Sequence, residues 1–275
     1  MPPPPDLAEK ARRLRLEILE MSLKGGGGHL PSAFSMADLL VALFHGGVLR
    51  WRRGEPRWSG RDRLIVSKGH AAAALYPILA DLDYFPRSEL GRYAQPDGLL
   101  GIFADPKVPG IEAPSGSLGH GVGIGAGIAW AAKQDGTDVR AFTVLGDGEC
   151  TEGSIWEAAL FAAHQGLDNL VAVVDRNGSC ILGHTEELVR LEPLEDKWRA
   201  FGWHTVRVDG HDFAGLLSAF ALVGRTEGRP LVVIADTVKG KGVPFMEDRP
   251  EWHNRLPSGE TAAQARRALG GGSGS

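Results

Sequence analysis

The chain has 275 residues, of which 43% are hydrophobic and 23% charged, values typical of a globular domain. Its 30 basic and 34 acidic residues give a net charge of −4, so it lacks the basic surplus that binding to nucleic acid requires. Two cysteines, Cys150 and Cys180, exclude a disulfide framework, and there is no signal peptide or run of 18 apolar residues. We therefore expect a cytoplasmic protein that binds neither nucleic acid nor membrane.

The N-terminal half is predicted to be mainly helical. Apolar residues at helical spacing predict a helix over residues 7–23, and Ser35 is a candidate N-cap for a second helix over 36–44. A short apolar run at 63–67 predicts a strand, which an alanine-rich helix follows. Turn-forming residues without periodicity predict a long loop over 91–114, and such loops are often functional.

The C-terminal half alternates apolar runs with periodic segments. Strands are expected at 139–145, 169–174, 204–208 and 230–237. Helices are expected at 119–133, 152–165, 194–201 and 213–223. This alternation predicts an α/β fold, a doubly wound and mostly parallel sheet with helices on both faces.

We expect one domain over residues 7–269. The proline-rich residues 1–6 are predicted to be a flexible N-terminus, and residues 270–275 a flexible Gly-Ser tail or linker. Glycine is unusually frequent, at 38 of 275 residues. Outside the tail it clusters in three segments, 25–28, 116–127 and 146–153, which suggests close approach of the backbone to another backbone or to phosphate.

Two polar turns follow neighbouring predicted strands. Gly146-Asp147-Gly148 ends the first, and Asp175-Arg176-Asn177-Gly178 ends the second. Because ligands bind beyond the carboxyl ends of parallel strands, we expect Asp147 and Asn177 at one edge of the sheet. Their oxygens suit Mg²⁺ or Ca²⁺, and the glycine N–H groups and a helix N-terminus suit phosphate. Either turn alone is more often an ordinary turn, but together they fit a metal-bridged diphosphate.

These residues resemble the signature of thiamine-diphosphate enzymes, in which Gly-Asp-Gly-Glu precedes a metal-binding asparagine at this spacing. The resemblance implies that Asp147, Asn177 and the backbone carbonyl of Ser179 hold Mg²⁺, or Ca²⁺, on the diphosphate of the cofactor. Arg176 departs from the family pattern, because an asparagine usually stands at this position.

Further motifs narrow the resemblance to the transketolase family. They are collinear from about residue 20 to 257 and comprise Gly28-His29-Leu30-Pro31, Ser67-Lys68-Gly69-His70, residues 115–121, 148–153 and 239–246, and Trp252-His253. The resemblance implies that His29 and His253 are catalytic, since they would handle hydroxyl protons or bind the sugar. The cofactor-binding residues it implies are His70, Ser117, Leu118, Gly119, Gly146, Gly148, Glu149, Asn177 and Ile181.

A full-length transketolase is more than twice as long as this chain and adds a pyrimidine-binding and a C-terminal domain. The resemblance therefore implies the N-terminal subunit of a two-chain transketolase, forming a heterotetramer with a partner subunit that carries the pyrimidine-binding domain. Together they would transfer a two-carbon ketol unit from a ketose donor to an aldose acceptor, either of which can be a sugar or a sugar phosphate. Segment 119–133 and Glu152 are expected to face the partner.

Three alternatives stay open at this point. A subunit of a 2-oxo acid decarboxylating complex shares the metal signature, but not the Ser-Lys-Gly-His and Trp-His motifs. A 1-deoxyxylulose-phosphate-type synthase and a non-catalytic diphosphate-binding module are the others.

The clearest departure from the family lies in the long loop. Transketolases of sugar-phosphate metabolism carry Gly-His-Pro there, and that histidine hydrogen-bonds the donor. Alignment back from Pro109-Gly110 places Ile102 at the histidine position. The resemblance then implies a more apolar pocket and weak activity on xylulose 5-phosphate with ribose 5-phosphate.

Overall fold

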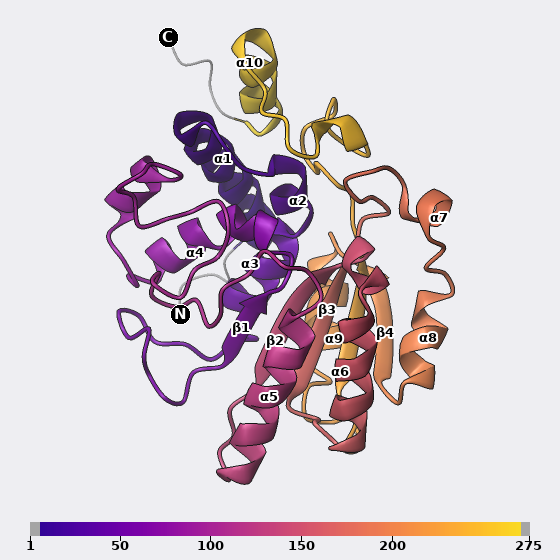
Figure 1. Cartoon of the computed structure of the whole chain (residues 1–275). Coiled ribbons are helices and arrows are strands. Elements are labelled where there is room, and N and C mark those ends of the chain that lie inside the picture. The colour runs from indigo at the N-terminus through magenta and orange to yellow at the C-terminus, as the bar shows by residue number, and fades with distance from the viewer. Residues whose placement is uncertain (1–5, 271–275) are drawn as a thin grey trace.

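The structure, a computed structural model, describes residues 6–270 and has a five-stranded sheet at its centre (Figure 1). All strands are parallel, and their order is β1-β2-β3-β5-β4. Their bounds are β1 (Arg63–Val66), β2 (Ala141–Gly146), β3 (Leu170–Arg176), β4 (His204–Asp209) and β5 (Leu231–Asp236). The predicted α/β fold is confirmed. Residues 1–5 and 271–275, most of the expected flexible ends, lie outside the described residues.

Helices cover both faces of this sheet. One face carries α1 (Leu7–Gly25), α2 (Leu30–Ser35), α3 (Ala37–His45), α4 (Tyr76–Asp81) and α9 (Phe213–Phe220). The other carries α5 (Gly121–Gln134), α6 (Gly153–His164) and α8 (Leu194–Ala200). Side chains of β2 alternate between these two cores, Phe142 and Val144 joining the first and Ala141 and Leu145 the second. Two further helices are α7 (Thr185–Leu188) and α10 (Gly259–Ala268), and α10 is tied to α1 by the ion pair Arg266–Glu20.

The glycines of α5 allow it to lie close to the sheet. A Cβ at Gly125 would stand 2.6 Å from the Oγ1 of Thr143 in β2, so a larger residue would push the helix away. On the outer side of the helix, a Cβ at Gly127 would meet nothing within 4 Å in the described structure. The glycine-rich sequence thus serves packing within the domain on one side of α5 and leaves the other side bare.

Several local predictions were wrong. Ser35 does not cap a helix, because it ends α2, and its Oγ donates to Asp175 Oδ2 at 2.6 Å. Asp175 and Arg176 were predicted in a turn but lie in β3, where the ladder continues to Asp236 of β5. The alanine-rich segment is a 3₁₀ helix over Gly69–Ala74 followed by α4. Helices α2, α7 and α10 were not predicted.

The ends of the strands determine where the functional groups gather. Ser67 and Lys68 follow β1, Asp147 follows β2, Asn177 follows β3 and Lys239 lies three residues beyond β5. The long loop predicted over 91–114 is confirmed apart from its first two residues, which end a 3₁₀ helix. No helix within residues 6–270 combines the length and apolarity needed to cross a membrane.

Candidate functional site

A cavity of about 520 Å³ opens at the carboxyl edge of the sheet. Four of the segments that follow strands contribute to its wall, through Lys68, Asp147, Asn177 and Lys239. The remaining lining residues that bear on function are His29, His70, Gly116, Leu118, Gly146, Gly148, Glu149, Ser179, Ile181 and His253. Most of the predicted site residues, taken from segments far apart in the sequence, therefore meet in one place.

Asp147 is held in a fixed orientation beside Asn177. Its Oδ2 accepts the Gly178 N–H at 2.6 Å and Arg176 Nη1 at 2.7 Å, and its Oδ1 accepts the Gly148 N–H at 2.8 Å. Gly178 has φ +73°, a turn that brings its N–H back to the carboxylate. Burial raises the pKa of Asp147, and the hydrogen bond from Arg176 opposes that rise. A cation at Asp147 would favour the charged form further.

The oxygen atoms available at this point suit a hard cation. Asn177 Oδ1 accepts the Ser179 N–H at 3.2 Å, which folds the amide over the Ser179 backbone. Among residues 6–270, no three His, Cys, Asp or Glu side chains gather to enclose a metal. One carboxylate, one amide and one backbone carbonyl form an incomplete set of the kind that Mg²⁺ uses when substrate phosphates and water supply the rest.

Glu149 lines the cavity and bonds three parts of the chain around it. Its Oε1 accepts Ser67 Oγ and the Gly119 N–H, the latter at 2.8 Å, and its Oε2 accepts the Gly146 N–H at 3.1 Å. Both oxygens are therefore used within the chain. These bonds hold the loops after β1 and β2 together with the start of α5, and the contact of Glu149 with the cofactor stays a prediction.

Three histidines form a triangle at one end of the cavity. The ring centroids of His29, His70 and His253 are 5.2 to 5.4 Å apart. Burial, aided by the charge of Lys68, lowers the pKa of His70 to about 2. Burial and the charge of Lys239 lower the pKa of His253 to about 3, and the same causes lower that of His29. The three rings are therefore neutral near pH 7 and can each accept one hydrogen bond and donate one.

Two of these rings have unused polar atoms. Nδ1 of His29 and Nδ1 of His253 are buried and have no hydrogen-bond partner within the described residues. Leaving a buried polar atom unpaired costs about 1–3 kcal/mol, and such atoms in a cavity commonly mark groups that a ligand will bond. This observation fits the role predicted for the two histidines toward a hydroxylated substrate.

Lys239 is a buried cation that the sequence analysis did not assign. It is 1% exposed, it forms no ion pair within residues 6–270, and its Nζ lies 3.4 Å from the Ser179 carbonyl and 3.3 Å from that of Cys180. Burial, with the charge of Lys68, lowers its pKa to about 8. The sequence feature that could have identified Lys239 as a site residue is its place in the Lys-Gly-Lys-Gly motif. An anion in the cavity would stabilise this charge, so a diphosphate beside the metal ligands fits the site.

The remaining predicted residues occupy the rim of the site. Leu118 lines the cavity, whereas the neighbouring Ser117 is exposed and is not part of the lining. Ile181 is 61% exposed at the cavity. Gly119 is buried and packs against Glu152. A Cβ at Gly119 would stand 2.7 Å from the Cβ of Glu152, which is too close for a side chain at this position.

In the long loop, Phe103 rather than Ile102 faces the histidines. The Phe103 ring centroid lies 6.3 Å from that of His29, and the side chain is 45% exposed. Ile102 instead packs on the backbone of Gly27, where a Cβ would stand 3.0 Å from its Cδ1. Tyr76 fixes this arrangement, because its hydroxyl donates to the Gly101 and Phe103 carbonyls at 2.8 and 3.1 Å. The apolar residue expected beside His29 is therefore present, but it is Phe103 and not Ile102.

Lys239→Met should weaken binding of thiamine diphosphate at saturating Mg²⁺ by about ten- to hundredfold. The reason is that a hydrogen bond from a buried charged group is worth about 1.5–3 kcal/mol. Calorimetric titration of the assembled protein measures this effect. Lys241→Met, two residues along the same loop and less buried, is the matched control and should change the affinity by less than about twofold. Equal affinities of the two variants would exclude the role.

The sequence and the fold were compared with known proteins. The family described as "Transketolase, thiamine diphosphate binding domain" matches residues 6–273. The 6-deoxy-6-sulfo-D-fructose transketolase subunit SqwG of Clostridium sp. (strain MSTE9) is 41% identical over 250 residues, 90% of each chain. One subunit of the apulose-4-phosphate transketolase of Phocaeicola vulgatus is 36% identical over 260 residues, 94% of this chain and 92% of that protein.

Solved structures agree with these relatives. The transketolase of Campylobacter jejuni superposes with a TM-score of 0.88 at 29% identity, and the transketolase of Leishmania mexicana with 0.89 at 26%. The similarity covers 96% and 97% of this chain, but only 42% and 41% of those chains. This chain therefore spans about two fifths of the length of the solved transketolases, while it matches the two subunit relatives along nearly their whole length.

Proposed function

This chain belongs to the transketolase family, through its thiamine diphosphate-binding domain, and we propose that it acts as the N-terminal subunit of a two-chain transketolase. The family match and the subunit relatives favour this function over a 2-oxo acid decarboxylating subunit, a 1-deoxyxylulose-phosphate-type synthase or a non-catalytic module. The free thiols of Cys150 and Cys180 support the cytoplasm as its compartment.

One observation carries the proposal. Oxygen ligands at Asp147, Asn177 and Ser179, an unpaired buried lysine and a triangle of neutral histidines line the same cavity. The first two features suit a metal-bound diphosphate, and the third suits a substrate rich in hydroxyl groups. Binding of a metal and a diphosphate alone would not require His29 and His253, so their presence in the cavity favours a catalytic subunit over a binding module.

We assign roles to the residues of this chain accordingly. Asp147, Asn177 and the Ser179 carbonyl would hold Mg²⁺, for which Ca²⁺ could substitute, and Lys239 and His70 would bind the diphosphate. Gly146, Gly148 and the backbone at 117–119 would form the adjoining wall. Thiamine diphosphate, when bound, supplies the carbanion chemistry of ketol transfer.

His29 and His253 would act on the sugar. Because both rings are neutral near pH 7, either can accept a hydrogen bond from a substrate hydroxyl through one nitrogen while it donates a hydrogen bond through the other. Their separation of 5.3 Å between ring centroids allows both to reach neighbouring oxygens of one substrate.

The substrate is proposed to be a specialised ketose. SqwG is named for a 6-deoxy-6-sulfo sugar and the Phocaeicola vulgatus relative for apulose 4-phosphate, and both names indicate sugars outside the standard pentose phosphates. Phe103, whose ring centroid lies 6.3 Å from that of His29, places an apolar side chain next to the histidines. These two observations support a donor or acceptor other than the standard pair of xylulose 5-phosphate and ribose 5-phosphate.

The outer surface of α5 and α6 is proposed to bind the partner subunit. Trp130 of α5 and Leu160 and Phe161 of α6 are 42% to 58% exposed, and Gly123 and Gly127 leave the helix backbone bare between them. Exposed apolar surface of this kind commonly marks a protein interface. A partner carrying the pyrimidine-binding domain would complete the cofactor site, and a heterotetramer is the expected assembly.

The purified chain alone should show no ketol transfer, because it supplies only one of the two domains that enclose the cofactor. Activity should appear on mixing with a partner chain carrying the pyrimidine-binding domain. A coupled assay of the aldehyde product, with each chain alone and with the mixture, measures this. Robust turnover by the isolated chain would contradict the proposal, as would an inactive mixture whose chains associate and bind the cofactor.

A further inference from the structure

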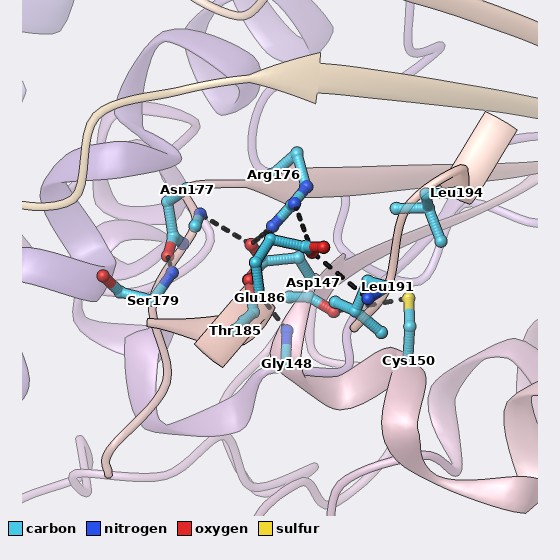
Figure 2. A network of polar contacts seen from close by, with 12 residues as sticks. Asp147, Gly148, Cys150, Arg176, Asn177, Ser179, Thr185, Glu186, Leu191 and Leu194 are labelled. Atoms are coloured by element: carbon cyan, nitrogen blue, oxygen red, sulfur yellow. Dashed lines mark hydrogen bonds and ion pairs between the residues drawn. The ribbon is translucent and has the colours of Figure 1, made fainter. Parts of the chain in front are cut away.

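Arg176 joins the proposed metal carboxylate to the chain that follows β3. Its guanidinium is 8% exposed, and Nη1 donates to Asp147 Oδ2 at 2.7 Å and to Thr185 Oγ1 at 2.8 Å (Figure 2). Nη2 donates to Glu186 Oε1 at 2.8 Å and lies 3.2 Å from Glu192 Oε1. One side chain thus bonds the metal site, α7 and the segment before α8.

The segment 178–192, which contains α7, has little apolar packing to hold it in place. Four of its five large apolar side chains are 46% to 80% exposed, namely Ile181, Leu182, Leu188 and Val189, and only Leu191, at the end next to α8, is buried in the core. Polar bonds take their place, since the Thr185 N–H donates to the Gly178 carbonyl at 2.9 Å and Glu186 Oε1 accepts the Leu191 N–H at 3.1 Å. A segment with few buried apolar contacts opens easily, so its bonds to Arg176 matter more than they would in a core.

The charges around Arg176 leave Asp147 able to bind a cation. The guanidinium of Arg176 bonds three carboxylates. Nη1 bonds Asp147, whereas Nη2 bonds Glu186 and Nε bonds Glu192. The positive charge is therefore not neutralised by Asp147 alone. Asp147 Oδ1 accepts only the Gly148 N–H among the described residues, and its second lone pair is available.

We infer that Arg176 is a positioning residue, which holds Asp147 and segment 178–192 together so that the Ser179 carbonyl stands ready beside the carboxylate. This inference rests on the proposed function of the site. Without Arg176, Asp147 loses one of its three donors, and the segment loses the bonds that Arg176 makes to Thr185, Glu186 and Glu192. Binding of the cation must then also order the segment, which weakens the binding.

The test compares Arg176→Asn and Arg176→Lys in the chain assembled with its partner. We expect Arg176→Asn to raise the Mg²⁺ concentration for half-maximal binding of thiamine diphosphate at least about tenfold, the usual cost of removing a group that orients a metal ligand. Protease cleavage within 178–192, measured without metal or cofactor, should become at least about tenfold faster. Arg176→Lys should change the Mg²⁺ requirement and the cleavage rate less, because lysine keeps the positive charge but cannot bond several carboxylates at once as the guanidinium does.

Arg207→Gln is the matched control. Arg207 also bonds Glu192, at 3.3 and 3.4 Å, but it does not contact Asp147. The variant's Mg²⁺ requirement and its rate of protease cleavage should stay within about twofold of those of the unsubstituted protein. If Arg176→Asn does not fold, Glu186→Ala serves instead, because it frees the segment while the bond between Arg176 and Asp147 remains.

The outcomes separate the inference from the proposed function. Unchanged Mg²⁺ requirement and unchanged cleavage in Arg176→Asn and Glu186→Ala, with normal cofactor binding by the unsubstituted complex, would overturn the inference alone. An unsubstituted complex that binds no thiamine diphosphate at any Mg²⁺ concentration would overturn the proposed function, while the metal-free cleavage rates still report whether Arg176 holds the segment.

Discussion

Asp147→Ala is expected to abolish Mg²⁺-dependent binding of thiamine diphosphate, with a loss of affinity of at least about a hundredfold. Removing a group that merely orients a metal ligand costs about ten- to hundredfold, so removal of the charged ligand itself should exceed that range. The neighbouring carboxylate of Glu149 is already bonded by three donors, from Ser67, Gly119 and Gly146, so it is not expected to replace Asp147. Calorimetric titration of the cofactor into the assembled protein, at several Mg²⁺ concentrations, measures the loss.

Two controls make this result specific. Asp138→Ala removes an exposed aspartate that is likewise paired with an arginine, Arg50, and it should leave cofactor binding unchanged. Asp147→Asn keeps the shape and one acceptor oxygen but removes the charge, so it should bind the cofactor weakly and need more Mg²⁺. Undiminished affinity in Asp147→Ala would show that the cation is held elsewhere.

The central sheet could be predicted because its signal is local. Each buried strand of a parallel sheet is a continuous apolar run, as in Val171–Val174, and each is bounded by turn-forming residues. The rule that ligands gather at the carboxyl ends then placed Asp147 and Asn177 together. Helices α2 and α7 were missed since a helix of four to six residues shows no full period of an apolar pattern.

The site itself was predictable only where a motif carried the residue. His29, His70 and His253 belong to motifs and do meet in the structure. Lys239 and Arg176 acquire their roles from tertiary contacts, the first by crossing from the end of β5 to Ser179 and the second by bonding a helix that was not predicted. No spacing along the chain encodes those approaches.

The long loop shows the same limit in another form. Residues 93–120 form no helix or strand, so no periodicity determines which side chains point inward. Alignment on Pro109-Gly110 therefore selected Ile102, whereas the bonds from Tyr76 turn Phe103 toward His29. In this loop the aromatic side chain beside His29 is therefore that of Phe103, and the contribution of either residue to the substrate pocket stays a prediction.

Phe103→His is accordingly expected to raise kcat/KM for xylulose 5-phosphate with ribose 5-phosphate, by about ten- to hundredfold over the weak activity of the unsubstituted complex. The phenyl ring can neither donate nor accept the hydrogen bond that a donor hydroxyl needs, and an unpaired buried hydroxyl costs about 1–3 kcal/mol. A panel of ketoses assayed with the reconstituted complex measures the change, and activity on a deoxy or otherwise less hydroxylated donor should fall in the same variant.

Ile102→His separates the two positions in the loop. Because Ile102 packs on Gly27 and does not face the histidine triangle, this substitution places a polar ring against the backbone and should lower the activity on every donor without changing their order. If Ile102→His raises the activity on the standard pair and Phe103→His does not, the loop presents residue 102 to the substrate. If the unsubstituted complex turns over the standard pair efficiently and neither variant alters the preference, the apolar side chains of this loop have no part in specificity.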